Sequence, residues 1–263
     1  MPAVIPFPQI DPILIEIGPL AIRWYALAYL AGLIGGWRYV QWLNRHAPKA
    51  MTPAQVDDLL LWITLGVVLG GRIGYVLFYN FGYYLDNPLQ ALVIWRGGMS
   101  FHGGLLGVVL AMVLFSRRHK LALLAIADLL ACATPIGLFF GRMANFINAE
   151  LYGRASDVPW AMVFPSDPEQ VPRHPSQLYE AALEGLLLFA VLFWLARFRG
   201  IRHRPGFATG VFLIGYAVAR MIVELFREPD AHIGFLAAGS TMGQMLSVPM
   251  VLGGAYLIWR ARR

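Results

Sequence analysis

Polar side chains that could do chemistry gather directly after a long apolar stretch of this chain. Residues 121–140 are almost wholly apolar, and GRMANFINAE, residues 141–150, follows with an arginine, two asparagines and a glutamate. Arg142 and Asn145 are three residues apart, so they share one face if the segment is helical. A guanidinium binds phosphate through two parallel N–H bonds, and an amide both donates and accepts. Glu150 can orient an arginine or act as a base.

A second stretch, YAVARMIVELFREPD, carries charged groups at helical spacing. It contains a phenol, two guanidinium groups and a carboxylate, spaced four, four and three residues apart: Tyr216, Arg220, Glu224 and Arg227. In a helix these side chains fall within about 80° of one face. Arg220 and Glu224 are expected to pair across one turn, which lowers the cost of burying either charge. The alternative is a buried pair that only fixes packing.

Glycines surround the third candidate, a histidine. In WRGGMSFHGGLLG, His102 stands between Gly97–Gly98 and Gly103–Gly104. An imidazole suits general-base work near neutral pH, although a lone histidine is more often structural. Glycines permit close approach of a ligand, turns or tight helix packing. In the same way, Gly141 is expected to allow close helix approach, and Gly153 is expected to make a turn.

Further polar residues lie where apolar segments begin or end. RWYALAY places Tyr25 near the start of the first apolar segment, and in RHPSQLYEA Ser176 is expected to cap the helix that follows. Four arginines are expected at or near the outer ends of apolar segments: Arg72, Arg142, Arg220 and Arg227. An ionisable group inside a membrane helix is by default a functional-site hypothesis.

The composition indicates a membrane protein. Of the 263 residues, 58% are hydrophobic and 14% are charged, against about 25% charged in soluble domains. The mean hydropathy is +0.59, and a membrane-spanning helix needs about 20 mostly apolar residues. We therefore predict an all-α polytopic membrane protein that forms one integral domain, 1–263, in the lipid bilayer. Its seven expected spans lie at about 22–42, 58–79, 101–116, 121–140, 178–197, 207–226 and 241–259.

The distribution of Lys and Arg predicts the orientation of these spans. Twelve of these residues lie in one alternate set of connecting segments, and three lie in the other: Arg96, Arg154 and Arg173. The positive-inside rule then places the N-terminus outside and the C-terminus in the cytoplasm. Prolines in the outer loop 148–176 indicate an ordered region. The other loops expected to face out are 80–100 and 227–240.

Several classes of protein are disfavoured by the sequence. The basic residues come in short blocks between apolar segments, which is typical of membrane topology and not of nucleic-acid binding. The single cysteine, Cys132, has apolar and small neighbours and is expected to pack and not to react. There is no HExxH, Walker loop or GxSxG, so no metal, nucleotide or other cofactor is expected. A transporter of anions or lipids and a non-catalytic scaffold remain as alternatives to an enzyme.

Four segments resemble those of one known family. GGMSFHGGLLG, GRMANFINAELYG, HPSQLYEA and YAVARMIVELFREPD are similar, in this order, to segments of bacterial phosphatidylglycerol–prolipoprotein diacylglyceryl transferases. The resemblance runs from about Ile10 to the last span. It implies the first step of lipoprotein maturation, in which the sn-1,2-diacylglyceryl group of phosphatidylglycerol moves to the lipobox cysteine of a prolipoprotein. A thioether forms and glycerol phosphate leaves.

The resemblance also implies a place and roles for residues. The enzyme would be a multi-pass protein of the bacterial cytoplasmic (inner) membrane, with its active site toward the outer side. Arg142 and Arg220 would hold the phosphate, His102 would take the thiol proton, and Asn145 and Glu150 would position Arg142 or the glycerol headgroup. The expected catalytic residues are Tyr25, His102, Arg142, Glu150 and Arg220. The residues expected to bind phosphatidylglycerol are Arg142, Asn145, Gly153, Tyr216, Arg220 and Glu224.

Overall fold

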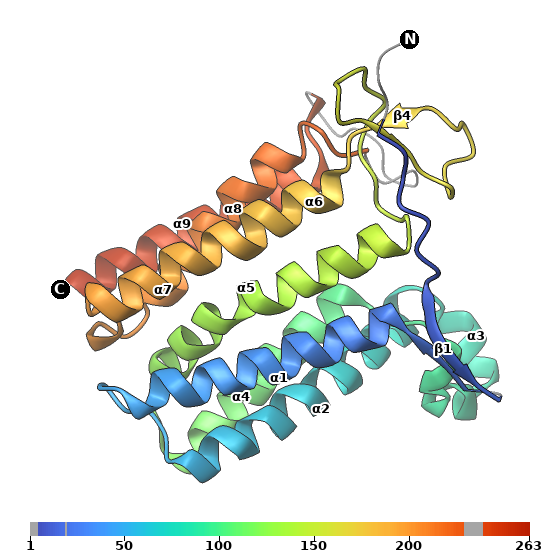
Figure 1. Ribbon diagram of the computed structural model, residues 1–263. Helices are drawn as coiled ribbons and strands as arrows, with labels where there is room; N and C mark the ends of the chain where they lie inside the picture. The colour runs from blue at the N-terminus through green and yellow to red at the C-terminus, as the bar shows by residue number, and fades with distance from the viewer. Residues whose placement is uncertain (1–4, 19, 229–238) are drawn as a thin grey trace. The chain divides into compact units, whose positions relative to one another are not determined.

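The computed structural model describes residues 5–18, 20–228 and 239–263, and most of them are helical (Figure 1). The apolar helix α8 (Phe207–Val223) is shorter than a full span, and α1 (Trp24–Arg45) covers the first predicted span. Within the described residues, five helices are long and apolar enough to cross a membrane: α2 (Pro53–Phe78), α4 (Phe101–His119), α5 (Leu123–Ile147), the continuous helix Ser176–Phe198 and α9 (Met242–Arg262). A polytopic helical membrane protein is therefore confirmed, whereas the count of seven spans and their orientation stay predictions.

Short elements connect these helices. The continuous helix consists of α6 (Ser176–Glu180), the π-helical η3 (Ala181–Leu187) and α7 (Leu188–Phe198). Two antiparallel strand pairs, β1–β2 and β3–β4, lie outside the helices. Of the predicted outer loop 227–240, residues 229–238 lie outside the described residues. The other short elements are β1 (Ile13–Ile17), β2 (Leu20–Arg23), α3 (Phe81–Asp86), η1 (Pro88–Leu92), η2 (Ile94–Arg96), β3 (Met162–Val163), β4 (Pro172–Arg173) and η4 (Ile201–His203).

Residues 1–40 and 128–263 form one compact unit. Within it, α8 packs against both α9 and α7, and Figure 1 shows these helices side by side. Asp128 of α5 caps α8, because its carboxylate accepts bonds from Gly206 N (2.8 Å), Thr209 N (2.8 Å) and Thr209 Oγ1 (2.7 Å). A helix start leaves such N–H groups without partners, and the glycine at this start has no side chain to satisfy them. The one carboxylate in the apolar run 121–140 therefore has a structural task.

Helices α1 and α5 approach closely at a pair of glycines in the same unit. A Cβ on Gly32 would lie 3.1 Å from Gly137 Cα, whereas one on Gly141 would meet no atom within 4 Å. The expectation that Gly141 allows close approach is therefore wrong. The approach occurs one turn earlier, where the Gly137 backbone faces Gly32. Cys132 is fully buried, as expected for a packing residue.

Residues 41–127 form the other compact unit, in which α2 packs along α4. A Cβ on Gly70 would lie 2.8 Å from Gly107 Cα, and a Cβ on Gly74 would lie 2.8 Å from Gly103 Cα. Glycines spaced four residues apart let two helix backbones come this close. Gly103, which directly follows the candidate histidine, therefore serves helix packing. A single domain over the whole chain stays a prediction.

Replacing Gly107 by Ala should destabilise this helix pair. A Cβ on Gly107 would lie 3.0 Å from Gly70 Cα and would collide with the Gly66 carbonyl, so the helices must separate at a cost of about 1–3 kcal/mol. Gly253→Ala in α9 is the matched control, because its Cβ meets no atom within 4 Å and alanine favours the helix by about 1 kcal/mol. Thermal unfolding in detergent measures both variants. A Gly107→Ala protein that unfolds at the temperature of Gly253→Ala would contradict the close packing.

The loop 148–176 packs an aromatic cluster against the end of α5 and the N-terminal segment. Phe164 is fully buried and packs against Phe146 at the end of α5, with ring centroids 6.3 Å apart. Phe7 from the N-terminal segment packs on both rings, at 5.2 Å from each. Tyr152 stacks on Phe164 from the other direction, with centroids 5.2 Å apart. These contacts form a small aromatic core that joins the loop to α5 and to the N-terminal segment.

An ion pair in the same loop gives it a pH-dependent stability. Arg173 Nε lies 2.6 Å from Asp167 Oδ2, and Arg173 Nη2 lies 3.1 Å from Asp167 Oδ1. Hydrogen bonds from Arg173 hold the pKa of Asp167 below its ordinary value of 3.8. Because the folded-state pKa is the lower one, the stabilisation is complete above about pH 5 and is lost as the pH falls through the folded pKa. Glu169 and Glu228 also contact Arg173, at 2.6 and 3.3 Å.

Hydrogen exchange of the amides in residues 164–173 should follow this pH dependence. After correction for intrinsic rates, protection should be constant above about pH 5 and should fall below it. Asp167→Asn should lower protection at all pH values, because Arg173 loses a buried charged partner. The control Glu169→Gln removes a carboxylate whose side chain is 69% exposed and should change little. Equal protection of Asp167→Asn and wild type at pH 7 would exclude this role of the pair.

Candidate functional site

Two fully buried glutamates lie one turn apart in the helix that follows the loop 148–176. Glu180 ends α6 and Glu184 lies in the π-helical η3, and both side chains are 0% exposed. At Gly185 a Cβ would lie 2.7 Å from Phe139 Cβ, so the π-helical turn packs tightly on α5. Short π-helical segments occur frequently at functional sites, where they redirect side chains.

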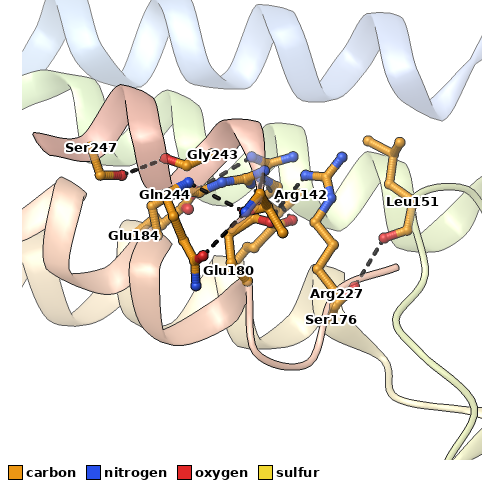
Figure 2. A network of polar contacts seen from close by, with 12 residues as sticks. Arg142, Leu151, Ser176, Glu180, Glu184, Arg227, Gly243, Gln244 and Ser247 are labelled. Carbon is orange, nitrogen blue, oxygen red and sulfur yellow. Dashed lines mark hydrogen bonds and ion pairs between the residues drawn. The ribbon is translucent and has the colours of Figure 1, made fainter. Parts of the chain in front are cut away.

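Arginines from three segments of the chain contact Glu180, and Figure 2 shows Arg142 and Arg227 beside it. Arg142 of α5 places Nε 3.2 Å from Glu180 Oε2. Arg220 of α8 places Nη1 2.6 Å from Glu180 Oε1, and Arg227 places Nη1 3.2 Å from the same oxygen. Buried charges persist only when they are paired, since an unpaired one costs several kcal/mol. One carboxylate thus fixes three cations that are far apart in the sequence.

Two more carboxylates complete the network. Arg142 Nη2 lies 3.4 Å from Glu184 Oε2, and Arg220 Nη2 contacts Glu224 Oε1 one turn further along the chain. The predicted pairing of Arg220 with Glu224 is therefore confirmed. Among the ion pairs of the described residues, three guanidinium groups of this network face three carboxylates.

The network exposes its cations and buries its anions. The side chains of Arg142 and Arg220 are 16% and 14% exposed, while Glu180 and Glu184 are 0% exposed. A ligand that reaches this cluster meets guanidinium edges and not carboxylate oxygens. Since guanidinium matches the planar, bidentate geometry of phosphate and carboxylate, the accessible side is suited to an anion.

The backbone of α9 covers the Arg220–Glu224 pair at a glycine. A Cβ on Gly243 would lie 3.0 Å from Arg220 Nε and 2.7 Å from the Glu224 carboxyl carbon. Ser247 one turn later donates its hydroxyl to the Gly243 carbonyl, at 2.7 Å. Figure 2 shows this first turn of α9 beside the network. Gly243 is therefore needed for the helix to lie against the ion pair.

Asn145 and Glu150 form a second polar group at the end of α5. Asn145 Nδ2 donates to Glu150 Oε1 at 2.7 Å, and Gln177 Nε2 donates to the Glu150 carbonyl at 2.7 Å. The Tyr25 side chain lies within electrostatic range of both Asn145 and Glu150. Arg142 is held by other carboxylates, so Glu150 orients Asn145 and not the arginine. Tyr25, Asn145 and Glu150, which were all singled out from the sequence, do lie together.

Gly153 does not make a turn, contrary to expectation. Its N–H donates to the His174 carbonyl at 2.8 Å, and it forms an isolated β-bridge with Arg227. A Cβ there would lie 2.7 Å from His174 Cβ. The chain is extended at this point because Gly153 joins two backbones that leave no room for a side chain. Arg154 next to it donates from Nε to the Arg227 carbonyl at 2.9 Å, which fixes the segment that carries Arg227.

Ser176 and Tyr216 belong to the same compact unit, residues 1–40 with 128–263. Ser176 is not the N-cap of its helix, because Pro175 takes that position. The Ser176 hydroxyl donates instead to the Leu151 carbonyl at 3.0 Å, which connects the helix start to the loop 148–176. Tyr216 lies on α8 within electrostatic range of Glu184, Arg142 and Arg220, as expected for a residue of the same site.

His102 and Arg72 belong to the compact unit 41–127. His102 is exposed in the first turn of α4, whose N-cap Ser100 accepts a bond from Gly103 N at 3.1 Å. Arg72 of α2 is 7% exposed and donates to main-chain carbonyls of the segment before α4. Of the four arginines expected at outer helix ends, three therefore share Glu180 and the fourth has a different set of partners.

The sequence reasoning missed Glu180 and Glu184, which hold the site together. The sequence contains a usable signal for them, namely two glutamates four residues apart inside the apolar run 178–197. No group of three His, Cys, Asp or Glu within the described ranges could hold a metal ion.

The fold and the site together define an integral membrane protein in which partly exposed arginines are paired with buried carboxylates. A sequence model of the family described as prolipoprotein diacylglyceryl transferase matches residues 12–260. The chain belongs to this family. Similar proteins named phosphatidylglycerol–prolipoprotein diacylglyceryl transferase occur in Paramagnetospirillum magneticum (61% identical, covering 98% of this chain and 96% of that protein) and in Azospirillum brasilense (61%, 98% and 97%). The Rhodospirillum rubrum protein of that name is 60% identical over 98% of this chain and 95% of its own.

Proposed function

We propose that this chain transfers the sn-1,2-diacylglyceryl group of phosphatidylglycerol to the lipobox cysteine thiol of a prolipoprotein. The names of its relatives state both substrates, and identity of 60% or 61% over nearly the whole chain supports the same reaction here. The observation that carries the proposal is the pair of partly exposed guanidinium groups, Arg142 and Arg220, on buried carboxylates. Such a pair suits the phosphodiester of a lipid headgroup.

The reaction exchanges one bond at carbon 3 of the glycerol backbone. The sulfur of the substrate thiolate attacks this carbon, a C–S bond forms, and the C–O bond to phosphate breaks. The electron pair of that C–O bond leaves with the phosphate oxygen, so glycerol phosphate gains negative charge as it departs. Guanidinium groups at the phosphate stabilise this developing charge. The nucleophile belongs to the substrate, so the buried Cys132 takes no part.

The carboxylates behind the arginines prepare the site before the lipid binds. Glu180 holds Arg142 at 3.2 Å and Arg220 at 2.6 Å, so neither guanidinium must reorganise during the reaction. The carboxylates also balance the arginines, which reduces the cost of charge at membrane depth. A phosphodiester then adds an anion on the exposed side, where only guanidinium edges are accessible.

The remaining site residues have proposed roles in binding and proton transfer. His102 takes the proton of the attacking thiol, directly or through water. Asn145, held by Glu150, binds the glycerol of the headgroup with its free amide functions. Four further residues complete the phosphatidylglycerol pocket or orient Arg220: Tyr25, Gly153, Tyr216 and Glu224.

The proposed setting is the bacterial cytoplasmic (inner) membrane, with the active site toward its outer side. The seven proposed spans are α1, α2, α4, α5, the helix Ser176–Phe198, α8 and α9. The bias of Lys and Arg toward alternate connecting segments supports an outer N-terminus and a cytoplasmic C-terminus. The prolipoprotein meets the lipid in this membrane through its apolar signal sequence.

Release of the headgroup tests the proposal. The purified full chain is placed in phosphatidylglycerol vesicles that carry a label in the headgroup glycerol, and a lipobox peptide is added. Labelled glycerol phosphate should appear in the aqueous phase, and a peptide with serine in place of the lipobox cysteine should give none. Release without any thiol would indicate a phospholipase. Labelled lipid that crosses the bilayer without release would indicate a transporter.

A further inference from the structure

Arg72 makes an unusually complete set of hydrogen bonds for a membrane arginine. A guanidinium carries five N–H donors, and here each of the five has a carbonyl acceptor 2.6–3.3 Å away. All five acceptors belong to the segment between α2 and α4. They are Gln90 (2.6 Å), Ala91 (2.7 Å), Val93 (3.3 Å), Gly97 (2.7 Å) and Gly98 (3.1 Å).

This pattern differs from that of the arginines in the other unit. Arg142 and Arg220 pair with carboxylates and keep an exposed edge for an anion. Arg72 is 7% exposed, and its five donors are all engaged with main-chain oxygens, so it has no donor left for a ligand. A charged donor bound to several carbonyls fixes them strongly, because each such bond is stronger than one between neutral groups. Arg72 therefore acts on the segment 90–98 and not on substrate.

The segment that Arg72 holds leads directly into His102. Gly97 and Gly98 both have positive φ, +82° and +79°, so the chain turns sharply here as only glycine readily allows. Ser100 N then donates to the Gly71 carbonyl of α2 at 2.9 Å, and α4 begins at the next residue. The first turn of α4, with its histidine, is thus attached to α2 through the Arg72 contacts.

We propose that Arg72 is a positioning residue for His102. By holding the carbonyls of residues 90–98 on α2, it fixes where α4 begins and where the imidazole of His102 lies when the thiol proton is removed. The inference rests on the proposed function, in which His102 takes that proton. Arg72 touches neither lipid nor peptide in this account, and its loss lowers the rate because the histidine moves.

A double-mutant cycle tests this dependence. The variants Arg72→Met, His102→Gln and the double variant are assayed as purified full chains in phosphatidylglycerol vesicles with a lipobox peptide. Arg72→Met should lower kcat by about 100-fold, the order of effect expected for a misplaced catalytic group, with a KM for the peptide near that of wild type. In the His102→Gln background the same change should lower kcat less than about two-fold, because the group that it positions is absent. Effects that multiply in the double variant would overturn the proposal.

A second variant keeps the test decisive if Arg72→Met fails to fold. A Cβ on Gly98 would lie 2.6 Å from Tyr75 Cε1 and 3.0 Å from Arg72 Nη1. Gly98→Ala therefore disturbs the same contacts while the arginine stays, and its loss of kcat should also require His102. The control Gly82→Ala lies in the same segment, where a Cβ meets no atom within 4 Å, and should behave as wild type.

The outcomes separate the inference from the function on which it rests. A folded wild type with no transfer defeats the proposed function. Transfer by wild type, with His102→Gln fully active and Arg72→Met impaired, leaves the function standing and overturns the positioning role. A loss of kcat in Arg72→Met and Gly98→Ala that disappears in the His102→Gln background supports the positioning role of Arg72.

Discussion

Arg142→Lys should lower the rate of diacylglyceryl transfer by about 10²–10³-fold without unfolding the protein, which is the usual effect of removing one donor that stabilises developing charge. Arg142 uses Nε for Glu180 and Nη2 for Glu184, so in the proposed function one planar group both anchors in the network and binds the phosphate. Lysine keeps the charge but has a single nitrogen and cannot do both. The rate of thioether formation in phosphatidylglycerol vesicles measures the loss.

Arg118→Lys is the matched control for this prediction. Arg118 is exposed near the end of α4, and the change there should leave the rate within about two-fold of wild type, as surface substitutions usually do. Thermal unfolding of both variants shows whether they fold. If Arg142→Lys folds and transfers as fast as Arg118→Lys, the bidentate phosphate site is excluded.

Glu180→Gln should be among the most destabilising changes in the chain. Glu180 contacts Arg142, Arg220 and Arg227, and glutamine of nearly the same shape removes its charge. Three arginines would then face two carboxylates, and an uncompensated buried charge costs about 3–5 kcal/mol. The thermal unfolding midpoint in detergent should fall clearly below that of Glu169→Gln, whose parent side chain is 69% exposed.

A second substitution distinguishes charge from packing in this prediction. Arg227→Met added to Glu180→Gln restores equal numbers of arginines and carboxylates in the network. The double variant should therefore be more stable than Glu180→Gln alone, since the two changes couple through one ion-pair network. A double variant that is less stable, by the sum of two separate losses, would show that charge balance is not what Glu180 provides.

Periodicity and apolar length were sufficient to predict the helices. Each predicted span coincides with a helix of the structure, because about 20 apolar residues in a row leave few alternatives in lipid. The residues at which these helices begin and end were predicted less accurately. Helix α2 begins at Pro53 and not near residue 58, because Thr52 and Gln55 form a capping box that extends it into a polar region. Helix α8 ends at Val223, short of the predicted 226.

Local spacing also predicted part of the site. Arg220 and Glu224 are four residues apart, and this distance alone places them in contact on a helix. Asn145 and Glu150 are close for a similar reason, since α5 ends between them and the chain folds back. Spacing within one segment cannot predict the partners of Arg142, because Glu180 and Glu184 lie about 40 residues later on another helix. Such contacts depend on how helices pack.

The roles of individual glycines also could not be predicted from the sequence. The sequence leaves open whether a glycine serves a turn, a tight helix contact or a ligand, because all three use the absence of Cβ. In the structure Gly97 and Gly98 form a sharp turn, Gly103 allows two helices to pack closely, and Gly153 joins two backbones. Each role depends on a neighbour that is distant in sequence, so residue type alone could not assign it.

The most direct test of the account is the mass of the peptide product. Purified wild type in phosphatidylglycerol vesicles is incubated with a lipobox peptide, and the cysteine is examined by mass spectrometry beside folded Arg142→Ala. We expect wild type to add one diacylglyceryl group through a thioether on that cysteine, and Arg142→Ala to leave the peptide unchanged. An unmodified peptide after incubation with folded wild type that binds phosphatidylglycerol would contradict the account.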